Sequence, residues 1–228
     1  MTNLLKLNDL RIKLDQLAEK IISKLKDRSR YKLNPNVYTP GKARVIKNKI
    51  SLFEYALKAK EEYYAKLGRY DFPDQEPITK NLSYLNINKK LNKYRIPKVK
   101  LNLYGKIIGF YINSLKKFCK KGNDSWTYGE TADCDAEIIE TLHERINLGK
   151  FVAKSKLKKN PLLINLKGKK LEKALRNMKR EKEVVLNARK MAKKYDFNEK
   201  VAEKYFKWII QETLNVEIAY IGGKNGNI

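Results

Sequence analysis

The sequence predicts an all-α protein, folded as a single-domain bundle of several long helices. Apolar residues recur every three or four positions over most of the chain, and strand-like alternation is weak throughout. No linker rich in Gly, Ser or Pro divides the 228 residues, a length that can bury a substantial core. We therefore expect one domain over residues 1–228, in which residues 221–228 form a flexible tail.

Helical periodicity and chain-breaking residues place the elements in order. The first helix carries an apolar stripe that includes Leu4, Leu7 and Leu14. Residues 30–48 contain two prolines, a glycine and the run NPNVY, so they should form an ordered loop, and Gly68 should end the second helix. The expected helices span about 4–28, 49–67, 100–120, 133–158, 168–195 and 198–220.

The chain is strongly basic, with a formal net charge of +26. Such a charge favours an anionic partner, which could be a nucleic acid, a membrane surface or an acidic small molecule. A lysine-rich surface that only keeps the protein soluble is compatible with the same charge. Composition alone therefore leaves the class of partner open.

The chain has few residues of the kinds that bind metals or act as nucleophiles. The single histidine, His143, nearly excludes a Ser-His-Asp triad or a histidine-rich metal site, and we expect it on a helix surface. Two cysteines, Cys119 and Cys134, cannot build a disulfide framework and fit a reducing compartment. No apolar run reaches membrane-spanning length, and the N-terminal residues follow a helical pattern and not that of a signal peptide. We therefore expect a cytoplasmic protein without a metal site or a membrane partner.

Polar side chains interrupt the apolar stripes of the predicted helices. Positions that are 3, 4, 7 or 11 residues apart share one face of a helix. Arg11 occupies an apolar position on the first stripe, and Arg145 and Lys156 both lie on the stripe of the fourth long pattern. Eleven residues rotate by a net angle of about 20°, so these two cations point the same way. Lys150 and Lys154 turn away from that face and should be solvated.

The last two predicted helices repeat this pattern. Asn177 and Glu181 lie on one apolar stripe, and Thr213 and Glu217 lie on another. Taken singly, each has an ordinary explanation, because a stripe arginine can snorkel and a threonine can bond its own backbone. Together the set holds three cations, two carboxyls, one amide and one hydroxyl. Two acids cannot neutralise three cations, so the surplus suggests an anionic ligand enclosed between the helices.

Several segments of the chain resemble segments of a known protein family. The stretches SLFEYAL, RYDFPDQEP and RINLGKFVAKSK are similar to segments of the all-helical chorismate mutases of the longer fungal and plant type. The resemblance runs from about residue 7 to residue 220. It implies an isomerase of the shikimate pathway that converts chorismate to prephenate for phenylalanine and tyrosine biosynthesis, as a homodimer and without a cofactor.

The resemblance also implies a role for each stripe residue. Arg11 and Arg145 would anchor the two substrate carboxylates. Lys156 and a protonated Glu217 would donate to the ether oxygen of the breaking bond. The remaining members of the set would contact the ring hydroxyl and complete the polar lining; they are Glu181, Asn177 and Thr213.

Family members of this type are inhibited by tyrosine and often activated by tryptophan, at a site on the dimer interface. Gly68 and Arg69 stand where the family has paired arginines, and Gly129 and Glu130 stand where it has Gly-Ser. Arg69 and Gly129 are therefore the candidate regulatory residues. Because Glu130 should repel the carboxylate of an amino acid, we expect altered or absent feedback control.

Two other functions remain compatible with the sequence. A helical nucleic-acid-binding protein would use the charge of +26 and the 14 tyrosines. It would not explain why acids and cations share apolar stripes. An inactive scaffold of the same fold is the other alternative, and the complete polar set argues against it.

Overall fold

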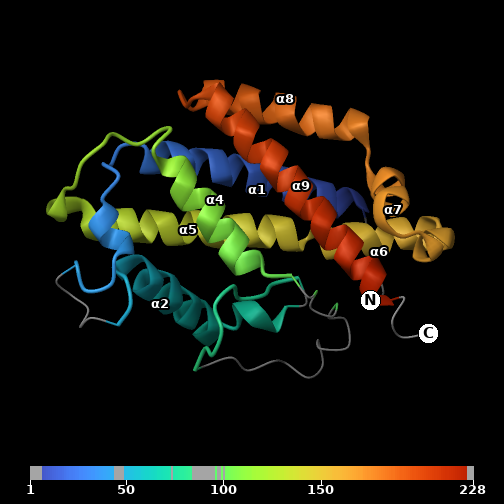
Figure 1. Ribbon diagram of the computed structural model, residues 1–228, viewed down its shortest axis with the longest axis horizontal. Helices are drawn as coiled ribbons and strands as arrows, with labels where there is room; N and C mark the ends of the chain where they lie inside the picture. Colours follow the sequence, from blue (N-terminus) through green and yellow to red (C-terminus); the bar gives the residue numbers. More distant parts are fainter. Residues whose placement is uncertain are drawn as a thin grey trace.

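The computed structural model describes residues 7–43, 49–72, 74–83, 96, 99 and 101–224, and these residues contain helices and no β-strand (Figure 1). The all-α prediction is confirmed. None of the described helices combines the length and the apolar composition needed to cross a bilayer. The predicted residues 4–6 of the first helix, 44–48 of the first loop and 225–228 of the tail lie outside the described residues.

Eight α-helices are found in the described part of the chain. Short 3₁₀ helices at Pro35–Tyr38, Arg69–Asp71, Ser125–Thr127 and Pro161–Asn165 lie between them. The α-helices are α1 (Leu7–Arg28), α2 (Leu52–Lys66), α4 (Leu103–Leu115), α5 (Tyr128–Asn147), α6 (Gly149–Lys159), α7 (Gly168–Leu175), α8 (Met178–Lys194) and α9 (Glu199–Lys224).

The single helix expected at 133–158 is two helices, α5 and α6. They meet at Leu148, which keeps right-handed helical dihedral angles (φ −59°, ψ −15°). The backbone N–H of Leu148 still donates to the carbonyl of Glu144. Because the backbone hardly departs from a helix there, α6 continues in the direction of α5 (Figure 1).

The helix expected at 168–195 is also divided, and here the break is sharp. Arg176 is extended (φ −67°, ψ 139°) and ends α7. Asn177 then begins α8 as its N-cap, with its side-chain oxygen accepting from the backbone N–H of Arg180 at 3.0 Å. Asparagine is among the strongest N-cap residues because it satisfies an N–H group that has no partner within the helix. This cap favours a new helix over continuation of the old one.

The last helix is longer than expected. α9 continues to Lys224, and Ile221 is fully buried. Burying an isoleucine side chain contributes about 1.5–3 kcal/mol. Residues 221–224 are therefore part of α9 and not of a flexible tail.

Helix α5 lies at the centre of the bundle, in contact with α1, α2, α4, α6 and α9 (Figure 1). Its side chains are buried on almost every face, as is typical of a central helix. His143 is one of them, so the expectation that it lies on the surface is wrong. Polar groups on this helix must therefore find partners inside the protein.

The apolar core has two main parts. The larger surrounds α5 and includes Ile21, Leu57, Ile139 and Phe206. The smaller packs α6 and α7 against α9 and the start of α1, with Leu148 among its members. Helices α1, α5, α6, α8 and α9, which contribute to these clusters, enclose the candidate site.

Candidate active site

A cavity of about 200 Å³ lies between α1, α5, α6, α8 and α9. Its volume is below the usual range for sites of drug-sized ligands, so it suits a small molecule. The polar side chains that the sequence pattern selected all line it. They are Arg11, Arg145, Lys156, Asn177, Glu181, Thr213 and Glu217.

Arg145 is a buried cation that lacks an anionic partner in the described part of the chain. Only 5% of it is exposed, its Nε has no acceptor among the described residues, and its guanidinium lies 5.4 Å from the ring centroid of Phe206. Burial lowers the pKa of Arg145 to about 10, so the group is still charged at pH 7. A buried charge without a counter-ion is costly. An anionic ligand in the cavity would remove that cost.

Lys156 and Glu217 form an ion pair in the cavity. Lys156 Nζ lies 2.7 Å from Glu217 Oε2 and 2.6 Å from the carbonyl oxygen of Leu175. Burial raises the pKa of Glu217 to about 7, against the opposing effect of the Lys156 ammonium and with a further rise caused by Glu181. Glu217 can therefore hold a proton near neutral pH and act as a hydrogen-bond donor.

Three of the predicted residues are less enclosed. Arg11 and Asn177 are exposed at the edge of the cavity, and Asn177 is occupied in part by its capping bond. The Thr213 hydroxyl donates to the carbonyl of Ile209 at 2.7 Å, so it does bond its own helix. Its oxygen can still accept a hydrogen bond from a ligand.

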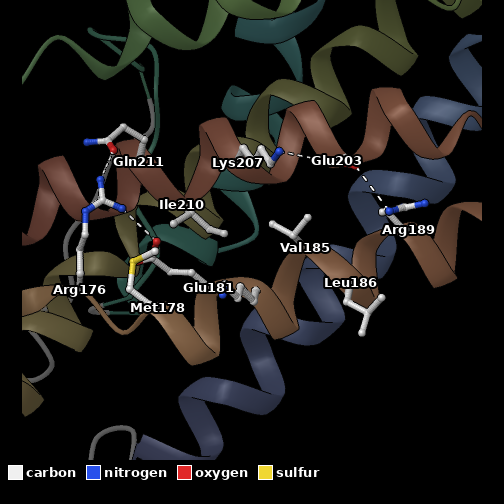
Figure 2. Close-up of a pocket in the computed structure, with 11 residues that line it drawn as sticks. Arg176, Met178, Glu181, Val185, Leu186, Arg189, Glu203, Lys207, Ile210 and Gln211 are labelled. Atoms are coloured by element: carbon white, nitrogen blue, oxygen red, sulfur yellow. Dashed lines mark hydrogen bonds and ion pairs between the residues drawn. The ribbon is translucent and has the colours of Figure 1, made fainter.

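Glu181 is held by an arginine that the sequence pattern did not select. Arg176 Nη1 donates to Glu181 Oε2 at 2.9 Å, and Arg176 Nη2 donates to Gln211 Oε1 at 2.6 Å. Figure 2 shows these bonds in an outer groove of about 440 Å³ between α8 and α9, which shares Glu181 and Ile210 with the cavity. Arg176 could not be found by helical phase, because it lies in the break between two helices.

Asp15 and Arg180 also line the cavity and were missed. Arg180 Nη2 lies 3.2 Å and 3.3 Å from the two carboxylate oxygens of Asp15. Asp15 lies four residues after Arg11, on the same face of α1, which is a signal that the sequence did contain. Arg180 lies three residues after Asn177 and four before Val184, so helical spacing contained a signal for it as well.

Of the two lysines between Arg145 and Lys156, only Lys154 is solvated. Lys150 is 1% exposed, and its Nζ lies 2.5 Å from Glu76 Oε1. The segment that carries Glu76 covers the start of α6, and such a long-range contact leaves no periodic pattern in the sequence. The expectation of a solvated Lys150 is therefore wrong.

Gly149 also has a different role from the one expected, which was to leave space for a ligand. A Cβ atom at Gly149 would lie 2.9 Å from the carbonyl oxygen of Thr213. The missing side chain therefore allows α6 and α9 to approach closely. This approach places Thr213 and Lys156, from different helices, in one cavity.

The two candidate regulatory residues lie far apart within the chain. Arg69 donates to Glu144 at 3.0 Å and to Gln75 at 3.1 Å, and it lies 4.4 Å from the ring centroid of Tyr64. Gly129 is exposed in the first turn of α5. The fifteen residues from Gly129 to Glu144 span about 22 Å along a helix. One chain therefore does not bring Arg69 and Gly129 together.

The described residues offer no metal centre, since no group of three His, Cys, Asp or Glu side chains among them is arranged to hold an ion. Cys119 and Cys134 are both free and buried. Burial raises the pKa of the Cys119 thiol to about 11 and that of Cys134 to about 12. Neither thiol is thus activated as a nucleophile.

The fold and the site define the class: an all-helical protein whose small, cation-rich cavity suits an anionic small molecule. Comparisons with known proteins identify the family within that class. A sequence profile described as chorismate mutase type II matches residues 127–218. Chorismate mutase from Schizosaccharomyces pombe is 32% identical over 161 residues, which cover 69% of this chain and 64% of that protein.

Two solved structures match over nearly the whole chain. The chloroplast chorismate mutase from Zea mays aligns with a TM-score of 0.82 and 25% identity, over 98% of this chain and 96% of that one. The chorismate mutase from Candida albicans, in complex with L-Trp, aligns with a TM-score of 0.77 and 25% identity, over 95% and 90%. The chain belongs to the chorismate mutase family, in its all-helical eukaryotic type.

Proposed function

We propose that the protein is a chorismate mutase, an isomerase that rearranges chorismate to prephenate within one molecule. The observation that carries the proposal is the cavity that Arg145, Lys156 and Glu217 share with the four other predicted residues. Its cations, which include Arg11, Arg145 and Lys156, match a substrate with two carboxylates. No covalent intermediate is needed, so holding the compact reactive conformer and stabilising developing charge can supply the rate enhancement.

Arg145 and Arg11 are the proposed carboxylate anchors. An arginine presents a planar fork of donors that fits a carboxylate. Arg145 is buried and charged, and no carboxylate of the described residues forms an ion pair with it, so little has to be displaced before the substrate binds. Arg11 is exposed at the edge of the cavity, where it can close over the second carboxylate.

Lys156 and Glu217 are proposed to stabilise the ether oxygen as its bond to carbon breaks. Negative charge grows on that oxygen in the transition state. Lys156 Nζ and Glu217 Oε2 lie 2.7 Å apart, so one oxygen atom placed beside both could accept from both when Glu217 is protonated. Donors aimed at developing charge each contribute about 3–4 kcal/mol in comparable sites.

Glu181 is proposed to accept from the ring hydroxyl of the substrate, with Asn177 and Thr213 completing the polar lining. The ion pair with Arg176 keeps one Glu181 oxygen occupied. The second oxygen remains available to the cavity that Glu181 lines. Arg176 would thus hold the acceptor in position.

The test is the loss of chorismate absorbance with purified protein. We expect turnover by the wild type and a fall in kcat/KM of at least about 100-fold in Arg145→Ala, because a carboxylate anchor is lost. The matched control is Lys154→Ala, which removes a solvated cation of the same segment and should retain activity. An inactive wild type would contradict the proposal and favour the inactive-scaffold alternative.

We further propose a homodimer in which aromatic amino acids bind between the subunits. Arg69 binds Glu144, which lies about 22 Å from Gly129 along α5, so only a second copy of the chain could combine Arg69 and Gly129 in one site. The Glu144 and Gln75 contacts of Arg69 compete with an effector carboxylate, and Glu130 would repel it. We therefore expect weak or altered feedback. Tyrosine and tryptophan should each be titrated against chorismate turnover, and strong inhibition by tyrosine would refute this expectation.

The nucleic-acid-binding alternative has no support from the comparisons, all of which point to chorismate mutases. We propose that the lysine excess is a solvated surface, and a cytoplasmic location is compatible with the two free thiols. Phenylalanine and tyrosine biosynthesis would be the pathway served.

A further inference from the structure

The ion pair between Asp15 and Arg180 lies on the same cavity as the proposed catalytic residues. It joins α1 to α8 through Arg180 Nη2 and both carboxylate oxygens of Asp15. The side chains are 48% and 35% exposed, so solvent reaches the pair. Arg180 has one further acidic neighbour, Glu183, whose Oε2 lies 3.6 Å from its Nη1. The pair is therefore weakly held and can be exchanged.

The other two carboxylates of the cavity lining already have partners. Glu217 is paired with Lys156, and Glu181 is paired with Arg176. Asp15 is thus the remaining carboxylate of the cavity lining, and it faces Arg180.

Arg145 feels both members of this pair. Burial is the main reason that the pKa of Arg145 is lowered, but the charge of Asp15 opposes the shift and the charge of Arg180 adds to it. Among the described residues, Asp15 is the anion whose charge raises the pKa of Arg145, and the same Asp15 is paired with Arg180. Asp15 therefore binds a cation of the cavity through the same chemical group that a ligand carboxylate would use.

We propose that Arg180 is a further substrate-positioning residue and that Asp15 is an internal carboxylate which the substrate displaces. One carboxylate of the dianion binds Arg180 beside Arg145, and Asp15 turns out to solvent. The inference rests on the proposed function for the identity of the substrate. It adds a cation to the set that binds the dianion, and it names the group that competes with the dianion.

The two residues should act on binding more than on turnover. Arg180→Gln removes the cation but keeps a planar side chain of similar reach, and KM should rise about tenfold or more while kcat changes much less. Asp15→Asn removes the competing charge at constant shape, and KM should fall about three- to tenfold. In the double variant the benefit of Asp15→Asn should shrink to less than about twofold, because the group for which Asp15 competes is gone.

Arg189→Gln is the matched control. Arg189 lies on the same helix and is likewise paired with acids, Glu199 and Glu203, but it lines the outer groove and not the cavity (Figure 2). Its loss should leave KM unchanged. A KM unaffected by Asp15→Asn and by Arg180→Gln would overturn the inference, and so would equal effects of Arg180→Gln and Arg189→Gln.

A binding measurement separates this inference from the proposed function. Calorimetric titration with phthalate, a small aromatic dicarboxylate, should give a Kd that follows the same order among the variants as KM does. If the wild type turns chorismate over but neither KM nor the phthalate Kd changes in the Asp15 and Arg180 variants, the ion-pair inference fails and the function stands. If the wild type is inactive, the function fails, and the phthalate titration alone decides the inference.

Discussion

Two buried arginines, Arg28 at the end of α1 and Arg145 near the end of α5, differ in their partners. Arg28, 0% exposed, donates to Asp135 at 2.7 Å and to the carbonyl oxygens of Lys32 and Leu33. Burial alone would lower the pKa of Arg28, but the Asp135 carboxylate, together with Tyr38, Tyr111 and Cys119, outweighs burial and the net shift is upward. Arg145 is buried almost as deeply, and its pKa falls to about 10 because the charge of Asp15 only partly offsets burial and the charge of Arg180 adds to it.

The difference separates a structural charge from a functional one. The contacts of Arg28 fasten the segment after α1 to the middle of the bundle, and they satisfy the charge before any ligand arrives. Arg145 is buried like Arg28 but has no comparable hydrogen-bond acceptors. A ligand that supplies them would therefore gain binding energy from Arg145. Both residues are arginines on predicted helices, and only the surrounding acceptors distinguish them.

Replacing each arginine by methionine should give the largest effects and opposite outcomes. Arg28→Met leaves Asp135 buried without its cation, so we expect a loss of about 3–5 kcal/mol in the free energy of unfolding. Arg145→Met removes a buried charge that has no counter-ion, so stability should be unchanged or raised while activity falls at least about 100-fold. Urea unfolding and chorismate turnover measure the two quantities. Similar destabilisation by both variants would erase the distinction.

The pH profile of Glu217→Gln tests the proposed role of the cavity that Arg145 lines. Because the pKa of Glu217 is raised to about 7, the protonated donor is present below that pH and is lost as the pH rises through it. Activity of the wild type should then fall about tenfold per pH unit on the alkaline side. A glutamine stays neutral, so kcat/KM of Glu217→Gln should be flat between about pH 6 and 9. An alkaline fall that persisted in the variant would remove Glu217 from the proposed mechanism.

Glu140 offers a third case, a buried acid outside the cavity. Its Oε1 has no hydrogen-bond partner among the described residues, and burial, followed by the charge of Glu61, raises the pKa of Glu140 to about 8. The folded state holds this proton more tightly than the unfolded state, so stability should decline as the pH rises from about 4.5 through 8.

Glu140→Gln should remove that decline. Compared with the wild type, the variant should gain on the order of 3 kcal/mol between pH 5 and pH 9 in urea unfolding. Glu130→Gln, in the exposed first turn of the same helix, is the control and should change little. Parallel pH dependence in Glu140→Gln and the wild type would mean that the carboxyl finds a partner when it ionises.

Helical phase selected seven polar residues of the cavity but missed Asp15 and Arg180. Arg145 and Lys156 keep their shared direction across the break at Leu148 because that residue remains nearly helical. Helical phase could not reveal contacts that a helix makes with irregular segments elsewhere in the chain. The burial of Lys150 by Glu76 and the hold of Arg176 on Glu181 arise from chain segments with no period of their own.

Two glycines give the smallest predicted effects. Gly149 begins α6 beside the cavity, and Gly129 lies in the first turn of α5, away from it. A Cβ at Gly149 would lie 2.9 Å from the Thr213 carbonyl oxygen and 3.1 Å from its Cγ2. Because a backbone oxygen cannot move aside cheaply, Gly149→Ala should cost about 1–2 kcal/mol and raise KM by displacing Thr213. At Gly129 a Cβ would meet nothing within 4 Å, so Gly129→Ala should stabilise α5 by about 0.5–1 kcal/mol. Urea unfolding of both variants, with KM for the first, measures this. If Gly149→Ala were as benign as Gly129→Ala, close approach of α6 to α9 would not be what positions Thr213 in the cavity.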